Sequence, residues 1–345
     1  MAPALPRTLV ISDLHVGGRF HRSVLERPLP RARLLEVVGG FERLVLLGDT
    51  VELAEGRPRR ALAAAGELLG EIGRALGRRG EVVLVPGNHD RALIRPWLRA
   101  MGRGLRVAGE VPAQASPALD ALCRRAAPAR VRVCYPGVWL SERVWATHGH
   151  YLDAHLIPVS TYGLARGLLG RAPSDRARPS DYERVRRPSL RLGAGLLPQV
   201  LGAPLSALAD LARATTMPLV RDAVLRPQIA PLTSALLSLQ MRRASMPALA
   251  RVVHRLGVEA EWVIFGHVHR LGPLPADDRE LWRGPNGSPR MANTGAWVWE
   301  PRLVTHATPP HPYWPGGAVV LEPGGEPHAV GLLDDLDAAA LRVGR

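Results

Sequence analysis

The sequence predicts an α/β protein, and three observations carry that prediction. Short runs of β-branched and aliphatic residues, Thr8–Ile11, Arg43–Leu47 and Val82–Val85, have the length and composition of buried strands. Between the second and third runs, Pro58–Arg79 has apolar residues at steps of three and four, typical of an amphipathic helix that Gly80 closes. A strand, a helix and a strand in succession indicate a βαβ unit with a right-handed crossover and a parallel sheet.

The composition is compatible with one large domain that carries an insertion. The chain has 345 residues, of which 46% are hydrophobic, enough for a sizeable core. Its formal net charge is +14, and every one of its 45 basic residues is Arg. Such an excess favours an anionic partner, either nucleic acid or an anionic membrane surface. Two cysteines make no disulfide framework, and Met1–Arg7 is unlike a signal peptide, so we expect a cytoplasmic protein.

Each of the three N-terminal strands runs directly into a turn that carries a carboxylate. The turns are Ser12-Asp13-Leu14-His15, Gly48-Asp49-Thr50 and Gly87-Asn88-His89-Asp90. Ligands in open α/β sheets bind at the carboxyl ends of the strands, where these turns lie. Taken alone, the third turn is equally compatible with capping of the next helix. Because a turn with polar side chains follows each of three successive strands, a functional site is favoured.

Two His-X-His segments follow later strands. Glu261–Phe265 predicts a buried strand that ends in His267 and His269. An antiparallel run of strands is predicted earlier, at Val131–Tyr135, Val138–Leu140 and Arg143–Thr147, and it ends in His148-Gly149-His150. We expect the remaining histidines to be ordinary surface or core residues: His21, His155, His254, His306, His311 and His328.

Imidazoles, carboxylates and an amide, without a thiolate, are ligands that suit divalent Mn, Fe, Zn or Ni. The five segments supply too many such groups for one ion. Two ions about 3.5–4 Å apart, bridged by a carboxylate, use them all and clamp the attacking and leaving oxygens of a phosphoryl transfer. The pattern therefore predicts a hydrolase with two divalent metal ions, with Mn the first expectation.

The five segments, taken as an ordered set, resemble the calcineurin-like metallophosphoesterases. They occur in the order of that family, each after a predicted strand, and span nearly the whole chain. The resemblance implies a β-sandwich of two mixed sheets flanked by helices. It also implies hydrolysis of a phosphoester or pyrophosphate bond, in which a metal-bridging hydroxide attacks phosphorus.

The resemblance also implies a role for each site residue. One ion would be held by Asp13, His15, Asp49 and His269, and the other by Asp49, Asn88, His148 and His267, with Asp49 as the bridge. His89 would stabilise the transition state or protonate the leaving oxygen, and Asp90 would orient it. His150 would support a ligand or touch phosphate.

The opening Ser12-Asp13-Leu14-His15, followed by Gly17-Gly18, is similar to the branch that contains the UDP-2,3-diacylglucosamine pyrophosphate hydrolases. Those enzymes typically have Arg at the position of His89 and Asp at that of His150. The resemblance therefore extends to the branch and not to its substrate. A lipid-linked or nucleotide-linked substrate is one expectation, and a nuclease is the alternative that the basic charge favours. A protein phosphatase and a non-catalytic scaffold are further alternatives.

Residues 151–250 form a predicted helical insertion between two parts of the main domain, 1–150 and 251–345. Two uncharged stretches within it, Leu192–Ala209 and Pro227–Met241, are shorter than a membrane-spanning helix and contain prolines. The simplest interpretation is a cap or lid over the site. The sharper hypothesis is that its Leu-rich helices and Arg clusters rest on an anionic membrane at its inner face, or bind a lipid phosphate. Beyond the insertion, strands at Arg302–His306 and Ala318–Leu321 are expected to complete the second sheet, and a solvated terminal helix to follow Asp334–Asp337.

Overall fold

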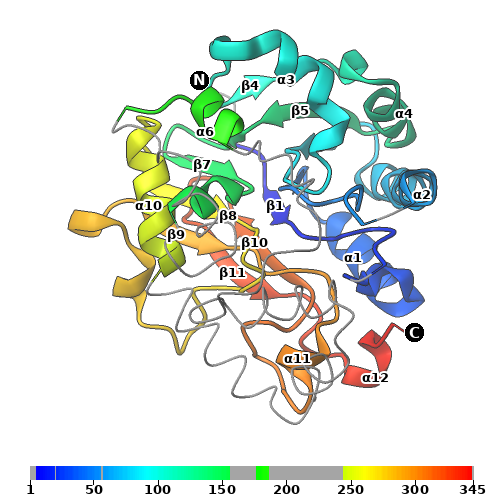
Figure 1. The fold of residues 1–345 in the computed structure, drawn as a ribbon. Coiled ribbons are helices and arrows are strands. Elements are labelled where there is room, and N and C mark those ends of the chain that lie inside the picture. Colours follow the sequence, from blue (N-terminus) through cyan, green and yellow to red (C-terminus); the bar gives the residue numbers. More distant parts are fainter. Residues whose placement is uncertain (1–4, 20, 56, 156–175, 186–243, 344–345) are drawn as a thin grey trace, which may run out of the picture.

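The computed structural model describes residues 5–19, 21–55, 57–155, 176–185 and 244–343. They form an α/β fold with two mixed sheets (Figure 1). The strands of the larger sheet are β1 (Thr8–Ile11), β2 (Arg43–Leu46), β3 (Glu81–Leu84), β4 (Gly109–Glu110), β5 (Arg130–Tyr135), β10 (Gly317–Leu321) and β11 (His328–Gly331). Their order is β11-β10-β1-β2-β3-β5-β4. The neighbours β1, β2, β3 and β5 are parallel, whereas β10, β11 and β4 pair antiparallel.

The smaller sheet has the order β6-β7-β8-β9. Its strands are β6 (Gly137–Trp139), β7 (Val144–Thr147), β8 (Trp262–Phe265) and β9 (Arg290–Asn293). The first pair is antiparallel, and β7, β8 and β9 are parallel. The mixed composition of both sheets agrees with the α/β class expected from the sequence.

Side chains that alternate along the strands divide the interior into layers. On the larger sheet Val10 and Val45 share one buried cluster with Ala146 and Ile264 of the smaller sheet. Their neighbours on β1 and β2, such as Leu9, face the opposite way, into a cluster with helices. Successive side chains of a strand point to opposite faces, so each sheet buries one face against the other and one face against helices.

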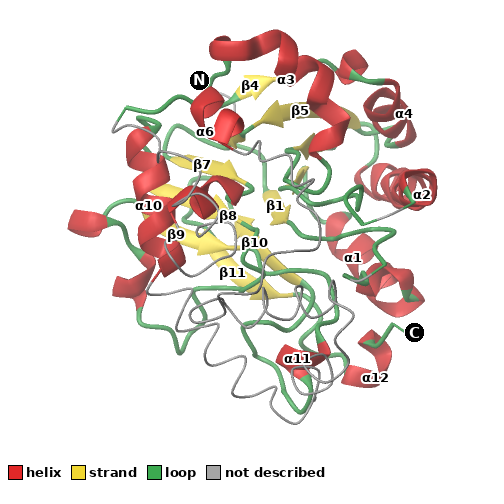
Figure 2. Ribbon diagram, in the orientation of Figure 1, coloured by secondary structure: helices red, strands yellow, loops and turns green. Residues whose placement is uncertain are grey.

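Helices cover both outer faces (Figure 2). The outer face of the larger sheet packs against α1 (Pro28–Val38), α2 (Pro58–Leu76) and α4 (Pro117–Arg125). The outer face of the smaller sheet packs against α10 (Met246–Arg255). Shorter helices are α3 (Arg95–Met101), α6 (Pro179–Val185), α11 (Pro301–Val304) and α12 (Ala338–Leu341).

Helix α2 ends earlier than its periodicity predicts. It stops at Leu76 because Gly77 adopts a φ of 68°, a left-handed conformation that glycine accepts without steric cost. Gly73, inside the helix, lies so close to the turn after α4 that an added Cβ would stand 1.9 Å from the Ala126 carbonyl oxygen. Close packing of these two helices therefore requires glycine at this position.

Four expectations about sheet membership and helices were wrong. Strand β5 belongs to the larger sheet, parallel to β3, and not to an antiparallel run with β6 and β7. Residues 301–304 are helical, with Pro301 at the first turn, and β10 pairs with β1 in the larger sheet. The terminal helix α12 is capped by Asp337, yet its Leu341 is fully buried. Local composition predicts that a segment is extended, but pairing is decided by distant residues.

The predicted insertion falls mainly outside the described residues. Residues 156–175 and 186–243, including Leu192–Ala209 and Pro227–Met241, belong to that part. Residues 150–155 form a short 3-10 helix, and α6 is a further described piece of this region. Among the described residues, no helix has the length and apolar character needed to cross a membrane.

Candidate metal centre

The predicted ligands converge at the carboxyl ends of β1, β2, β3, β7 and β8. Two groups of three bring their donor atoms within 4.8 Å of one another: Asp13, His15 and His269, and Asp49, His148 and His267. A further group joins Asp49 to His15 and His89, so Asp49 lies next to both. Asn88 reaches the second group, since its Oδ1 is 3.1 Å from His148 Nε2.

The first group contains buried polar atoms that lack a hydrogen-bond partner. Asp13 Oδ1 is 3.2 Å from His269 Nε2 and 4.0 Å from His15 Nε2. Within the described part of the chain, neither Asp13 Oδ1 nor His15 Nε2 makes a hydrogen bond, and both are buried. An unsatisfied buried group costs about 1–3 kcal/mol, so this convergence is expensive unless a cation occupies the space between the atoms.

Hydrogen bonds to backbone and side-chain groups orient the second group. His148 Nδ1 donates to the Leu47 carbonyl at 2.9 Å, which directs Nε2 towards Asp49 Oδ2 at 3.2 Å. Such a bond on one ring nitrogen fixes the other as a ligand. Asp49 Oδ1 accepts from the His89 backbone N–H at 2.8 Å, and His267 Nε2 lies 2.9 Å from Asp153 Oδ1.

Left-handed backbone conformations are concentrated at these residues. Among non-glycine residues of the described segments, positive φ occurs at five predicted ligands and at only two other positions. The ligands are Asp13 (55°), His15 (45°), Asp49 (51°), His267 (69°) and His269 (56°). Such conformations are uncommon outside glycine, and strain of this kind clusters at functional sites.

Glycines beside the ligands leave no room for a side chain. A Cβ at Gly87 would lie 2.3 Å from Asp49 Oδ1 and 2.7 Å from His148 Cδ2. A Cβ at Gly48 would lie 2.3 Å from the His148 ring. The turns after β2 and β3 therefore approach His148 only because they contain glycine.

Charge is balanced within the centre. Burial alone would raise the pKa of Asp49, but the neighbouring His148 and His89 hold it well below its ordinary value. Burial would lower the pKa of His148, but Asp49 and Asp13 raise it to about 9. Burial likewise opposes ionisation of Asp13, and His269 and His148 lower its pKa. The carboxylates are therefore ionised, which is the form in which Asp13 and Asp49 can act as metal ligands.

Glu52 is a site residue that the sequence analysis missed. Its side chain is buried, and Oε2 lies 2.8 Å from His15 Nδ1 and 2.7 Å from His89 Nδ1. Burial would raise the pKa of Glu52, but bonds to these two rings lower it to about 2. The only signal in the sequence is its position three residues after Asp49.

Asp90, expected to orient His89, makes its hydrogen bonds to the backbone instead. Its carboxylate accepts from the backbone N–H of Gly87 at 2.6 Å and of Thr50 at 2.8 Å, while Glu52 bonds the His89 ring. Burial, with the nearby Asp49 charge, raises the pKa of Asp90 to about 6. Asp90 thus joins the turns after β2 and β3 and does not orient the His89 imidazole.

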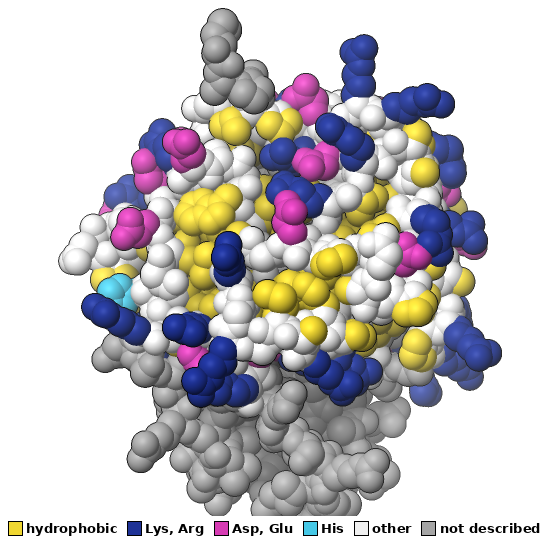
Figure 3. Space-filling model, turned by 90° about the horizontal axis from the view of Figure 1, so that it is seen from above, with side chains coloured by type: hydrophobic (Ala, Val, Ile, Leu, Met, Phe, Trp, Pro, Cys, Tyr) yellow, Lys and Arg dark blue, Asp and Glu magenta, His cyan; other side chains and the backbone are white. Residues whose placement is uncertain are grey.

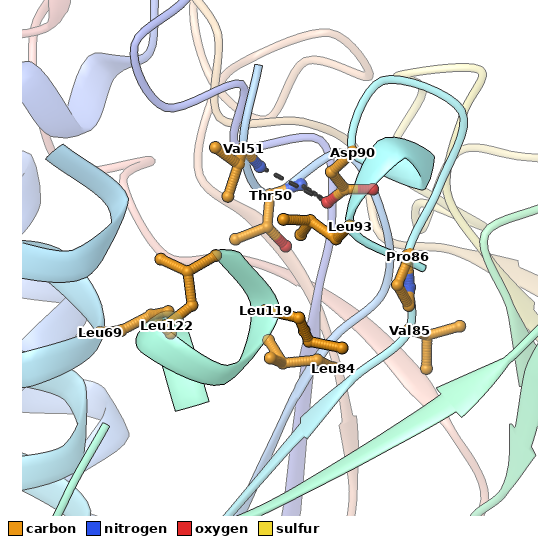
Figure 4. Close-up of a pocket in the computed structure, with 10 residues that line it drawn as sticks. All are labelled: Thr50, Val51, Leu69, Leu84, Val85, Pro86, Asp90, Leu93, Leu119 and Leu122. Carbon is orange, nitrogen blue, oxygen red and sulfur yellow. Dashed lines mark hydrogen bonds between the residues drawn. The ribbon is translucent and has the colours of Figure 1, made fainter. Parts of the chain in front are cut away.

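Figure 4 shows Asp90 directed at Thr50 and Val51, above a small pocket. Apart from Thr50 and Asp90, the lining is apolar: Val51, Leu69, Leu84, Val85, Pro86, Leu93, Leu119 and Leu122. The pocket lies between β3, α2 and α4, so it belongs to the packing beneath the centre.

His21 was expected to be an ordinary residue, yet it adjoins the centre. Its ring centroid is 5.0 Å from that of His15 and 6.0 Å from that of His89, and Nδ1 bonds Glu55. His150, a predicted site residue, places its ring centroid 5.4 Å from that of His148. Its Nε2 is 3.2 Å from the Tyr135 hydroxyl oxygen.

Comparison with known proteins adds no assignment. No protein-family model matches the chain, and no curated protein matches it. Any assignment of function therefore depends on the geometry of the centre.

Proposed function

We propose that this chain is a binuclear metal-dependent hydrolase of phosphoester or pyrophosphate bonds, built on a metallophosphoesterase-type sandwich. One observation carries the proposal: two adjoining ligand groups meet at Asp49, and the first contains two buried atoms without hydrogen-bond partners, Asp13 Oδ1 and His15 Nε2. Nitrogen and oxygen donors in this number suit divalent Mn, Fe, Zn or Ni.

The residues present fit two ions. One would be held by Asp13, His15, Asp49 and His269, and the other by Asp49, Asn88, His148 and His267. When bound, such ions activate water and neutralise the charge that develops on a transferred phosphoryl group.

His89 supplies the proton in this proposal. Burial would lower its pKa, but the bond to Glu52 and the Asp49 charge raise the pKa to about 9. Its side chain keeps 21% of its surface exposed, whereas Glu52 and His15 are buried. A protonated imidazole held at the edge of the site is suited to donate to a leaving oxygen.

Nuclease activity is the second candidate, because the net charge of +14 favours an anionic polymer. On the face seen in Figure 3, Arg side chains lie both at the border and in the middle of the face, and in its upper half several stand beside Asp or Glu. We rank a lipid-linked or nucleotide-linked phosphate first, because residues 151–250, most of which lie outside the described residues, are Leu-rich and are not interleaved with the aromatic residues on which single-stranded nucleic acid stacks.

A substrate comparison tests the proposal. Metal-stripped protein reloaded with Mn²⁺ would be assayed on bis-nitrophenyl phosphate, nitrophenyl phosphate, single-stranded DNA and a UDP-linked diacyl sugar, each with and without chelator. Chelator-sensitive hydrolysis of a phosphate ester supports the proposal, and preference for DNA favours the nuclease. Absence of turnover on all four substrates in the presence of two bound ions would contradict the proposal and favour the scaffold alternative.

A further inference from the structure

The carboxylate of Glu183, in helix α6, contacts side chains from three other stretches of the chain. Oε1 accepts from the Tyr151 hydroxyl at 2.8 Å and from the Tyr135 hydroxyl. Oε2 forms an ion pair with Arg91. The Glu183 side chain is only 11% exposed, so these bonds are shielded from water.

The bond directions around Tyr135 follow from the donors available. A tyrosine hydroxyl has one proton, and an ionised carboxylate only accepts. Tyr135 therefore donates to Glu183, and its oxygen accepts from His150 Nε2, 3.2 Å away. This order requires that His150 Nε2 carries a proton.

Two of the three partners of Glu183, Arg91 and Tyr151, follow the turns that carry Asn88 and His148, and the third, Tyr135 of β5, contacts His150. Arg91 follows Asn88-His89-Asp90 directly, while His150 and Tyr151 follow His148. The side chains of Asn88 and His148 are themselves in contact, with Oδ1 and Nε2 3.1 Å apart. One carboxylate therefore fixes both turns at the point where the second ligand group forms.

The position of α6 does not depend on Glu183 alone. The Ala177 backbone N–H donates to the Arg255 carbonyl at the end of α10 at 3.1 Å. The rings of Tyr182 and Tyr151 stack with centroids 4.8 Å apart and an interplanar angle of 8°. Because these contacts hold the helix, loss of the Glu183 bonds alone leaves α6 docked and changes the turns it supports.

We propose that Glu183 is a positioning residue for the second metal position, acting through Arg91 on the Asn88 turn and through Tyr135 on His150. The inference rests on the proposed function, because it assigns Glu183 to the same centre. A carboxylate from a distant segment thus completes the support of ligands that come from β3 and β7.

Two substitutions separate the two arms. Glu183→Gln keeps Oε1 for the tyrosines but sets an N–H donor against Arg91, and Tyr135→Phe removes the bond to His150. Asp181→Asn is the matched control, since Asp181 lies on the same helix and pairs with Arg184 at the surface. Each protein would be measured for the affinity of each of two Mn²⁺ ions by calorimetry, for kcat and KM on bis-nitrophenyl phosphate, and for Tm.

We expect Glu183→Gln and Tyr135→Phe to weaken the second Mn²⁺ and lower kcat by about 10-fold or more, with little change in KM. Asp181→Asn should stay within twofold of wild type. In the Zn²⁺-loaded wild type, nitrogen-15 NMR of labelled histidine should show a protonated Nε2 on His150, and Tyr135→Phe should shift that signal.

Other results would overturn the inference. If Glu183→Gln and Tyr135→Phe lower Tm while metal affinity and kcat stay within twofold, Glu183 only docks α6. An unprotonated His150 Nε2 would contradict the bond order at Tyr135. Absence of wild-type turnover would instead contradict the proposed function, while the Mn²⁺ affinities and the His150 signal still decide the role of Glu183.

Discussion

Asp49 carries the greatest functional weight of any single residue in this account. It adjoins both ligand groups, contacts His148 at 3.2 Å, and accepts from the His89 backbone. Its negative charge is also the main reason that the pKa of the buried His148 rises to about 9 despite burial.

Asp49→Asn should therefore lose both ions and all measurable turnover. Loss of an outer partner of a ligand costs about 10–100-fold in metal affinity, and loss of a shared ligand should exceed that range. Metal analysis after gel filtration checks the ions, and circular dichroism checks that the fold persists. Two retained ions in this variant would exclude Asp49 as the bridge.

Substitution of Glu52 should affect both metal affinity and kcat, because Glu52 bonds the rings of His15, a ligand, and His89, the proton donor. Glu52→Gln should weaken the first ion through His15 and lower kcat through His89, each by about 10–100-fold.

His89→Asn should lower kcat by about 100-fold or more with metal content unchanged. Parallel measurements of kcat and metal stoichiometry distinguish the two variants, and equal metal loss in both would make His89 a ligand.

The sequence revealed site residues that lie within about five places of a strand end and missed Glu52 and His21, which lie further along their loops. Asp13, Asp49, His148 and His267 each stand one to three places after a buried strand, where position alone indicates an edge of the sheet. Glu52 and His21 lie further along their loops, and only the folded path of those loops brings them to His15. Local spacing therefore predicted the ligands but not the side chains that orient them.

At the scale of elements, strands were easier to predict than their partners. β1 has the expected bounds, and β2, β3 and β8 differ from expectation by about one residue, because a buried strand has a local signature. β5 and β10 were assigned to the wrong sheet, since pairing depends on residues far away in the chain. The segment at Pro301 is helical although its composition suggested a strand, because proline suits the first turn of a helix.

The contact between α2 and the end of α4 gives a prediction for one element. Gly73→Ala should destabilise the fold by about 1–3 kcal/mol, because the new Cβ would overlap the Ala126 carbonyl. Gly66→Ala on the same helix is the control, since its Cβ would stand 3.5 Å from the flexible Arg125 side chain. Urea denaturation should show the control unchanged or more stable. Equal stability of both variants would contradict the close helix contact.

At the scale of the whole molecule, the two sheets unite ligands from opposite ends of the chain. Asp13 follows β1 of the larger sheet and His269 follows β8 of the smaller sheet, yet their side chains are 3.2 Å apart. The shared cluster that includes Val10, Val45 and Ile264 fixes this approach. The centre therefore depends on packing between the sheets.

Metal binding should in turn stabilise the whole fold. Ions at a concentration about 100 times their Kd contribute about 2.7 kcal/mol per site when only the folded state binds them. Addition of a chelator should therefore lower Tm in wild type. Asp49→Asn provides the control, because its Tm should not respond to chelator. An unchanged wild-type Tm would mean that the ions do not bind the folded chain.

The central claim is that two ions share Asp49, and anomalous diffraction from Mn²⁺-soaked crystals tests it most directly. We expect two peaks, one beside Asp13, His15 and His269 and one beside Asn88, His148 and His267, with Asp49 touching both. A single peak, or peaks away from Asp49, would contradict the binuclear centre.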